Sequence, residues 1–185
     1  HDRKQRDINR GKQNGRSSEI QRRMGSSIRS VIDHKKHEKR TIWIDCDVLQ
    51  ADGGTRTASI TGGCVSAAIA INRLVSQGKL KDFPLKKLVA AVSAGIYKGE
   101  AILDLNYPED RDAAVDFNVV MTEAGEYVEL QGSGEEDIFT SEQMNAMLDL
   151  SSKGIAKLIE LQKEAIIAAD KATDSDLEGL AAAFK

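Results

Sequence analysis

The spacing of hydrophobic residues changes along the chain and predicts the elements of its first half. After a polar, glycine-punctuated stretch over residues 1–16, apolar residues recur at helical spacing from Ser17 and predict a helix. β-Branched and apolar residues then alternate over residues 41–50 and predict a strand. A Gly-Gly turn at residues 51–56 leads into a second helix, predicted over residues 57–76, whose many small residues favour close packing against a sheet.

The second half of the chain predicts four strands followed by a long helix. Residues 88–96, 101–105, 115–122 and 127–130 look like strands. Lys98 and Gly99 form a hairpin signal between the first two, and polar loops are expected at residues 106–113 and 131–137. A long amphipathic helix starts at Ser141, and the Ala-rich tail predicts a short helix from Ser175. This order of elements predicts an α+β protein with helices packed on a sheet.

Composition narrows the class of protein. A chain of 185 residues with 41% hydrophobic and 30% charged residues predicts a soluble domain with one core. We expect no membrane span and no secretion signal, because no apolar run approaches about 18 residues and the first residues are polar. Two cysteines cannot make a disulfide framework, which favours a reducing, cytoplasmic location. Aromatic residues, at 4%, are too few for base-stacking platforms.

Charge is distributed unevenly along the chain. Residues 1–40 hold 13 basic and 5 acidic residues, whereas residues 41–185 hold 13 basic and 24 acidic residues. A basic arm on an acidic body favours a polyanionic partner, although a solvated, poorly ordered terminus has the same composition. Charge alone therefore leaves both interpretations open.

The turn before the second predicted helix is a candidate anion site. Gly53 and Gly54 let the backbone turn, and the helix start adds free N–H groups and a positive dipole end. Thr55 and Arg56 supply a hydroxyl and a guanidinium, both good phosphate ligands. The turn is not a P-loop, since no Gly-Lys-Ser/Thr follows. An ordinary strand-to-helix turn remains the alternative.

A second candidate site is acidic. Glu109, Asp110, Asp112 and Asp116 run from a predicted loop into a strand, and Asp110 and Asp116 can converge. Paired carboxylates can hold a divalent cation or divide acid and base roles, and a solvated loop is the alternative.

Other polar residues are weaker candidates. A polar sheet face would explain Asp45 and Asp47, and a solvated turn would explain the acidic pair at 135–136. The three histidines lie in polar stretches, Cys46 and Cys64 read as core residues, and no Cys/His metal spacing exists.

Several motifs together resemble bacterial ribonuclease PH. Residues 40–47 read RTIWIDCD and residues 50–62 read QADGGTRTASITG. The similarity extends over residues 3–165, through GR at 15–16, EIQR at 19–22, LDLNY at 103–107, ED at 109–110, VDFNV at 115–119, ELQG at 129–132 and QKEA at 162–165.

The resemblance implies a fold and an activity. The fold is the α+β module of ribonuclease PH, also called ribosomal protein S5 domain 2-like, with a mixed sheet. The activity is phosphorolytic 3′→5′ trimming of tRNA precursors, which uses inorganic phosphate, needs Mg²⁺ or Mn²⁺ and releases nucleoside diphosphates. The family assembles as a hexameric ring of dimers. The resemblance also implies a division into a basic arm (1–16), the family domain without its N-terminal strands (17–165) and a tail without assigned role (166–185).

The same resemblance assigns site residues. Phosphate is expected at Arg16, Gly54, Thr55 and Arg56, the catalytic and metal-binding carboxylates at Asp110 and Asp116, and tRNA contacts at Arg3 and Arg6. We take Asp110 as the general acid and Asp116 as the residue that orients the site or a metal. A non-catalytic RNA-binding ring subunit on the same fold is the alternative, but such a subunit is expected to lack some of these residues. A hydrolytic nuclease is disfavoured, because it would need no phosphate site.

Overall fold

The computed structural model describes residues 15–33, 36, 40–134 and 137–171. The helices are α1 (Gly15–Ser30), α2 (Thr55–Ser76), α3 (Tyr107–Asp112) and α4 (Ser141–Lys171). The strands are β1 (Val89–Tyr97), β2 (Glu100–Leu103), β3 (Val115–Thr122) and β4 (Tyr127–Gly134). The predicted α+β class is confirmed, with α2, the four strands and α4 close to their predicted positions.

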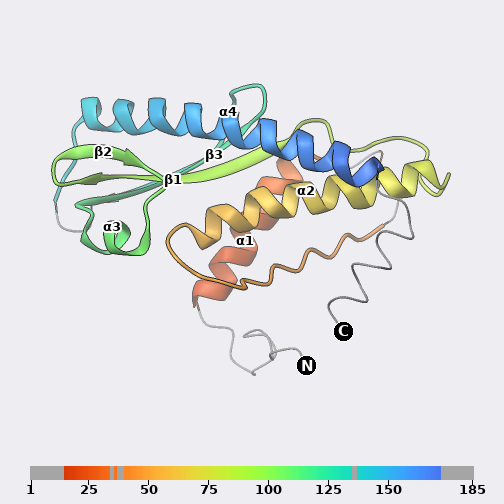
Figure 1. The fold of residues 1–185 in the computed structure, drawn as a ribbon, viewed down its shortest axis with the longest axis horizontal. Coiled ribbons are helices and arrows are strands. Elements are labelled where there is room, and N and C mark those ends of the chain that lie inside the picture. Colours follow the sequence, from red (N-terminus) through yellow and green to blue (C-terminus); the bar gives the residue numbers. More distant parts are fainter. Residues whose placement is uncertain (1–14, 34–35, 37–39, 135–136, 172–185) are drawn as a thin grey trace.

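The four strands form one antiparallel sheet in the order β2-β1-β3-β4. β1 is buried along almost its whole length because it lies inside the sheet beneath helices (Figure 1). The predicted hairpin between β1 and β2 is confirmed, since Lys98 (φ 51°) and Gly99 (φ 84°) both take the left-handed conformation that a tight two-residue turn requires. The start of β3 has a polar face, because half-buried Asp116 and Asn118 alternate with buried apolar residues. These buried residues are Val115, Phe117 and Val119.

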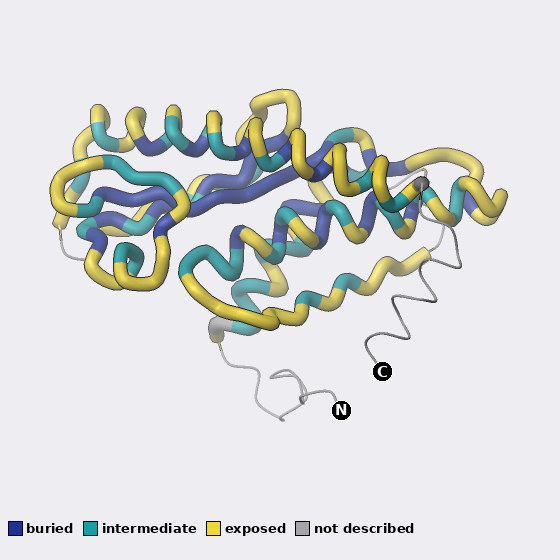
Figure 2. Tube along the Cα trace, viewed as in Figure 1, coloured by how far each residue is buried: buried dark blue, intermediate teal, exposed yellow. Residues whose placement is uncertain are grey.

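The core lies where α2 and α4 pack on the sheet (Figure 2). Gln162 of α4 joins α4 to α2 and to β1, because its amide donates hydrogen bonds to the carbonyls of Thr61 (2.8 Å) and Val89 (3.0 Å). The expectation of no membrane-length apolar segment needs a correction: α2 is long and apolar enough to cross a membrane by length and composition. Its buried residues, which include Cys64 and Ile71, belong to this core, so we interpret α2 as a core helix.

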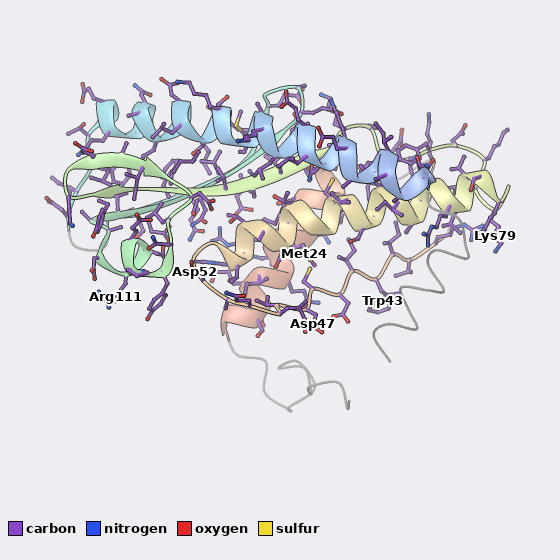
Figure 3. All side chains as sticks on the ribbon, in the orientation of Figure 1. Met24, Trp43, Asp47, Asp52, Lys79 and Arg111 are labelled. Atoms are coloured by element: carbon purple, nitrogen blue, oxygen red, sulfur yellow. The ribbon has the colours of Figure 1, made fainter. Side chains whose placement is uncertain are left out.

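The prediction of a strand over residues 41–50 is wrong. The segment is extended and runs beside α2, where Ile44 and Cys46 are half-buried and the Cys46 thiol lies 3.4 Å from the Met24 sulfur. Trp43 and Leu49 are 90% and 94% exposed, and Figure 3 shows Trp43 on the outer side of the segment. Alternating residues make a strand only beside another strand, and among the described residues this segment has no strand partner.

Three other boundaries differ from the sequence prediction. The loop expected at 106–113 contains α3, because Asn106 and Glu109 form a capping box that no hydrophobic pattern reveals. The loop expected at 131–137 is in part strand, since β4 continues to Gly134. Helix α4 continues past residue 165 to Lys171. Arg3, Arg6, the three histidines, the pair at 135–136 and the helix predicted from Ser175 lie outside the described residues.

Candidate functional site

The N-terminus of α2 is open in a way that favours anion binding. Gly54 precedes it with φ 68°, a left-handed conformation that suits glycine, and no side chain caps the helix. Its first turn holds no acidic residue, and the Thr57 hydroxyl donates to the Gly54 carbonyl (2.8 Å). The first backbone N–H groups of α2 therefore have no side-chain acceptor among the described residues and remain available to a ligand.

The turn before α2 is fixed against the start of α3. The Asp52 carboxylate accepts a hydrogen bond from the Tyr107 backbone N–H (2.7 Å), and Figure 3 shows Asp52 beside the α3 region. Gly53 packs so closely on the Leu105 carbonyl that a Cβ atom there would overlap it. The Asn106 side chain accepts from the Glu109 N–H at 3.0 Å, which starts α3 at this point. The two motifs found in the sequence, the glycine turn and the acidic stretch, are thus held together.

Arg56 faces carboxylates without being bound by them. Its guanidinium nitrogens lie 3.9 Å from Asp116 Oδ2 and 3.8 Å from Glu19 Oε1, and the side chain is 32% exposed. Both distances exceed hydrogen-bond length, so the carboxylates attract the guanidinium but do not occupy its donors. Within the described part of the chain, Arg56 therefore keeps donors available for an oxyanion beside the open end of α2.

Arg23 lies in the same cluster and is bound tightly. It contacts Glu19 at 2.7 Å and Glu129 of β4 at 2.7 Å, and its side chain is 15% exposed. The space shared with Arg56 is a cavity of only about 20 Å³, enough for a single water. Arg23 thus fastens α1 to β4 and leaves no room there for a phosphate.

Asp116 is held at the start of β3. It pairs in register with Gly95 of β1 and Ser133 of β4, and its side chain is 17% exposed. The Asn118 amide donates to Asp116 Oδ1 at 3.1 Å. Gly95 is required beside it, since a Cβ atom would press on the Val115 carbonyl. The carboxylate is therefore positioned by the sheet and oriented by Asn118 and Arg56.

Asp110 is placed differently. It lies half-buried in α3, and no hydrogen bond or ion pair joins its carboxylate to another described residue. Its neighbour Asp112 pairs with Arg111 at 2.6 Å, and this contact holds the pKa of the Asp112 carboxyl below its usual range. No group of three or more His, Cys, Asp or Glu side chains converges anywhere in the described ranges. Asp110 and Asp116 do not by themselves form a protein-held metal site.

Two depressions of about 550 Å³ flank the α2 N-terminus. One is lined by the extended segment and by small residues of α2, including Ala58 and Gly62. The other lies toward α4 and is lined by Gly54, Asp104 and Lys157, among others. The open helix end can therefore be approached by a chain-like ligand from more than one side.

Family models cover most of the chain. The model of the 3′ exoribonuclease family, domain 1 (RNase_PH), matches residues 3–73, and the model of domain 2 (RNase_PH_C) matches residues 87–154. The chain belongs to this ribonuclease PH family. Its fold is accordingly ribonuclease PH-like, as the sequence motifs predicted.

Solved structures with the ribonuclease PH-like fold agree with this assignment. Rice (Oryza sativa) Rrp46 has a TM-score of 0.63 at 17% identity, over 84% of this chain and 68% of that protein. An archaeal exosome core has a TM-score of 0.59 at 20% identity, over 80% of this chain and 64% of that one. The Archaeoglobus fulgidus exosome with RNA bound to the active site has a TM-score of 0.59 at 20% identity, over 82% of this chain and 63% of that one. At these identities the comparison establishes the fold.

The structure brings some predicted residues of this family together and not others. Gly54, Thr55, Arg56 and Asp116 lie around the α2 N-terminus; Arg16 starts α1, but its side chain is not described. Sequence reasoning assigned no role to Asn118, Glu19 or Arg23, although all three belong to the cluster. Asn118 was detectable, because residues two apart on a strand share a face with Asp116.

Proposed function

We propose that this protein is a phosphorolytic 3′→5′ exoribonuclease. The observation that carries the proposal is the uncapped N-terminus of α2 with Arg56 beside it, whose donors are not occupied by the carboxylates it faces. Free N–H groups and a guanidinium are the chemistry that binds inorganic phosphate. A dedicated phosphate site favours attack by phosphate over attack by water.

The proposed reaction needs no covalent nucleophile from the protein. An oxygen of phosphate attacks the last phosphodiester phosphorus of the RNA, and the bond from that phosphorus to the preceding ribose O3′ breaks. The products are a nucleoside diphosphate and an RNA shorter by one nucleotide. Asp110 donates the proton to the departing O3′, and Asp116 keeps Arg56 oriented toward the phosphate. Positioning and electrostatics supply most of the rate.

Mg²⁺ or Mn²⁺ is proposed as the supporting metal. Mg²⁺ binds through one or two carboxylates, several waters and substrate phosphates. The described residues fit such a shared arrangement, with Asp116 or Asp110 as protein ligand, better than a site built from protein alone. The ion would neutralise charge on the phosphates of RNA.

The substrate and the assembly extend the same proposal. We propose 3′ ends of tRNA precursors as substrate, Arg16 as a further phosphate ligand, Arg3 and Arg6 as RNA contacts, a hexameric ring of dimers and a cytoplasmic location. The basic residues 1–40 support an RNA contact, because phosphate neutralisation by Lys and Arg drives RNA binding.

A non-catalytic RNA-binding ring subunit is the second candidate. The solved structures with the same fold belong to Rrp46 and archaeal exosomes, which suits a ring subunit as well as an enzyme. The lack of a described contact between Asp110 and Asp116 is also compatible with it. The retained glycine turn, Arg56 and Asp116 favour the enzyme.

The test uses an RNA labelled at its 5′ end with an extended 3′ end, Mg²⁺, and the protein with or without phosphate. The enzyme predicts stepwise shortening and nucleoside diphosphates only when phosphate is present. RNA binding without shortening would support the ring subunit, and nucleoside monophosphates without phosphate would indicate hydrolysis. The chain spans between 63% and 68% of the length of the solved relatives.

A further inference from the structure

An apolar groove lies at the end of the sheet remote from the phosphate site. It has a volume of about 330 Å³ and an almost wholly apolar lining from Ala68, Phe83, Leu85, Leu88, Ile166 and Ile167. It borders Leu88 and Glu123, whereas Asp116 pairs with Gly95 at the opposite end of β1 and β3. The groove therefore has no part in the proposed chemistry.

Two large apolar side chains on this groove are exposed. Phe83 is 42% exposed and Ile167 is 53% exposed. Covering such side chains releases free energy, at about 25 cal/mol per Å² of apolar surface removed from water. The groove is too small for a standard protein interface of about 1,600 Å² and suits a few side chains of one short segment.

The chain itself supplies a segment of matching chemistry. Fourteen residues follow Lys171, the last residue of α4, and Ile167 lies one helical turn before that end. Within them Ser175 and Glu178 form a capping-box signature. Leu177, Leu180, Ala181 and Phe184 then recur at the spacing of one helix face. Gly179 lowers the intrinsic stability of such a helix by about 1 kcal/mol, so docking is needed to hold it.

The length of chain beyond α4 allows this occupant, and lysines beside the groove give its carboxylates cross-linking partners. The groove is bordered by Lys86, Lys87 and Lys163, which already pair with Asp33 (3.5 Å), Glu126 (2.6 Å) and Glu123 (2.8 Å). The segment carries Asp174, Asp176 and Glu178 against one lysine. Residues 172–176 can span about 17 Å when extended, enough to turn back from the end of α4 onto its last turns.

We propose that residues 175–184 fold back as a short amphipathic helix and place Leu177, Leu180 and Phe184 in this groove. The segment then acts as a built-in clamp on the end of α4 and on the entry to β1. The proposal is independent of the phosphorolytic activity, because the groove and the α2 N-terminus are separate.

A zero-length carbodiimide cross-linking experiment on the full chain tests the clamp. It joins carboxylates of the segment to Lys86, Lys87 or Lys163 when they are in contact, and mass spectrometry identifies the joined peptides. A mixture of ¹⁵N-labelled and unlabelled protein separates links within one chain from links between chains. The clamp predicts links within one chain.

Matched variants decide the outcome. Leu180→Asp removes an apolar contact from the segment, and Ile167→Asp removes one from the groove. Each is expected to lower the yield of cross-links within one chain at least about tenfold. Ala182→Asp, on the opposite face of the predicted helix, and Leu161→Asp, which is 51% exposed on α4 outside the groove, are expected to change it less than about twofold. Links only between chains, links to other lysines, or equal losses in all four variants would overturn the proposal.

Hydrogen exchange gives a second readout that does not depend on charge. Amides of residues 163–171 are expected to exchange faster in Leu180→Asp than in the wild type and in Ala182→Asp. Equal exchange in the three proteins would contradict the clamp.

Discussion

Arg23 and Arg56 lie side by side at the junction of α1, α2 and the sheet, yet they are bound in opposite ways. Arg23 makes 2.7 Å contacts with Glu19 and Glu129 and is nearly buried. Arg56 stays 3.8 and 3.9 Å from Glu19 and Asp116 and is twice as exposed. Arg23 has both terminal nitrogens bound by carboxylates, with only its buried Nε lacking a partner among the described residues, whereas Arg56 presents its donors beside an uncapped helix end.

This difference separates a structural ion pair from a ligand site within one cluster. A guanidinium in direct contact with two carboxylates has little left to offer a phosphate, whereas one held at a distance is oriented but available. Glu129 and Asp116 show the same difference toward the two arginines, since Glu129 binds Arg23 at 2.7 Å whereas Asp116 lies 3.9 Å from Arg56. The following changes test this division, starting with the largest expected effect.

Replacing Asp116 by Asn is expected to reduce turnover by a factor of about 100 or more, because the site loses the charge that orients Arg56. RNA binding measured by filter retention should stay within about twofold. Asp110→Asn should also reduce turnover and leave RNA binding within about twofold, because it removes the proposed proton donor. Lost binding with retained turnover in either variant would place the chemistry elsewhere.

Replacing Arg56 by Ala is expected to raise the phosphate concentration needed for half-maximal rate by about 30-fold, the equivalent of about 2 kcal/mol for a charge-assisted contact. The thermal midpoint should change little, because neither ion pair of Arg56 is a direct hydrogen bond. An unchanged phosphate dependence would refute the phosphate role of Arg56.

Replacing Arg23 by Ala is expected to lower the free energy of unfolding by about 1–3 kcal/mol, since Glu129 loses its partner in a half-buried position. Urea unfolding measures this loss. For the protein that remains folded, the phosphate concentration needed for half-maximal rate should match that of the wild type. A phosphate defect as large as that of Arg56→Ala would abolish the distinction between the two arginines.

Replacing Asn106 by Ala removes the cap of α3 and should cost about 1 kcal/mol of stability. Because α3 carries Asp110, the rate should fall while the phosphate dependence stays constant. Asn106→Asp keeps a capping acceptor and serves as the control. Equal rates in the Ala variant and the wild type would show that the position of α3 does not matter.

Glu123, at the far end of the sheet, sets a pH dependence that the site should not share. Burial alone would raise its pKa, but hydrogen bonds from Lys163 and from the Leu88 N–H outweigh burial and lower the pKa below 4.5. A lowered pKa contributes stability that is complete above pH 4.5 and is lost as the pH falls through the folded value. Glu123→Gln should therefore be less stable than the wild type at pH 7 and should converge with it in acid. A constant difference across this range would contradict the assignment.

Much of the fold was predictable from the sequence because the pattern of apolar residues reflects burial. β3 and α4 follow regular patterns and β1 is a continuous apolar run, and the predicted positions of all three are close to the observed ones. The segment 41–50 has the same alternation as β3 but forms no strand, since pairing depends on a neighbour that local pattern does not reveal. α3 was missed because a capping box, not an apolar stripe, starts it.

The candidate site was predictable in its residues more than in its geometry. The glycine turn and Arg56 follow from the motif, and Asp116 follows from its place on a strand. Whether carboxylates bind each arginine directly cannot be predicted from the motif. The contact distances depend on Glu19 of α1 and Glu129 of β4, which are far apart in the sequence. The position of Asp110, whose carboxylate makes no hydrogen bond or ion pair with another described residue, likewise depends on the hydrogen bond that joins Asp52 to the start of α3.

The central claim is that phosphate bound at the α2 N-terminus is the attacking group. The most direct measurement follows ³²P-labelled inorganic phosphate, with unlabelled RNA and Mg²⁺, into the released nucleotide. The account predicts label in the terminal phosphate of nucleoside diphosphates, in the wild type and in Arg23→Ala, and a strong loss in Arg56→Ala. RNA that shortens while the released nucleotides stay unlabelled would contradict it.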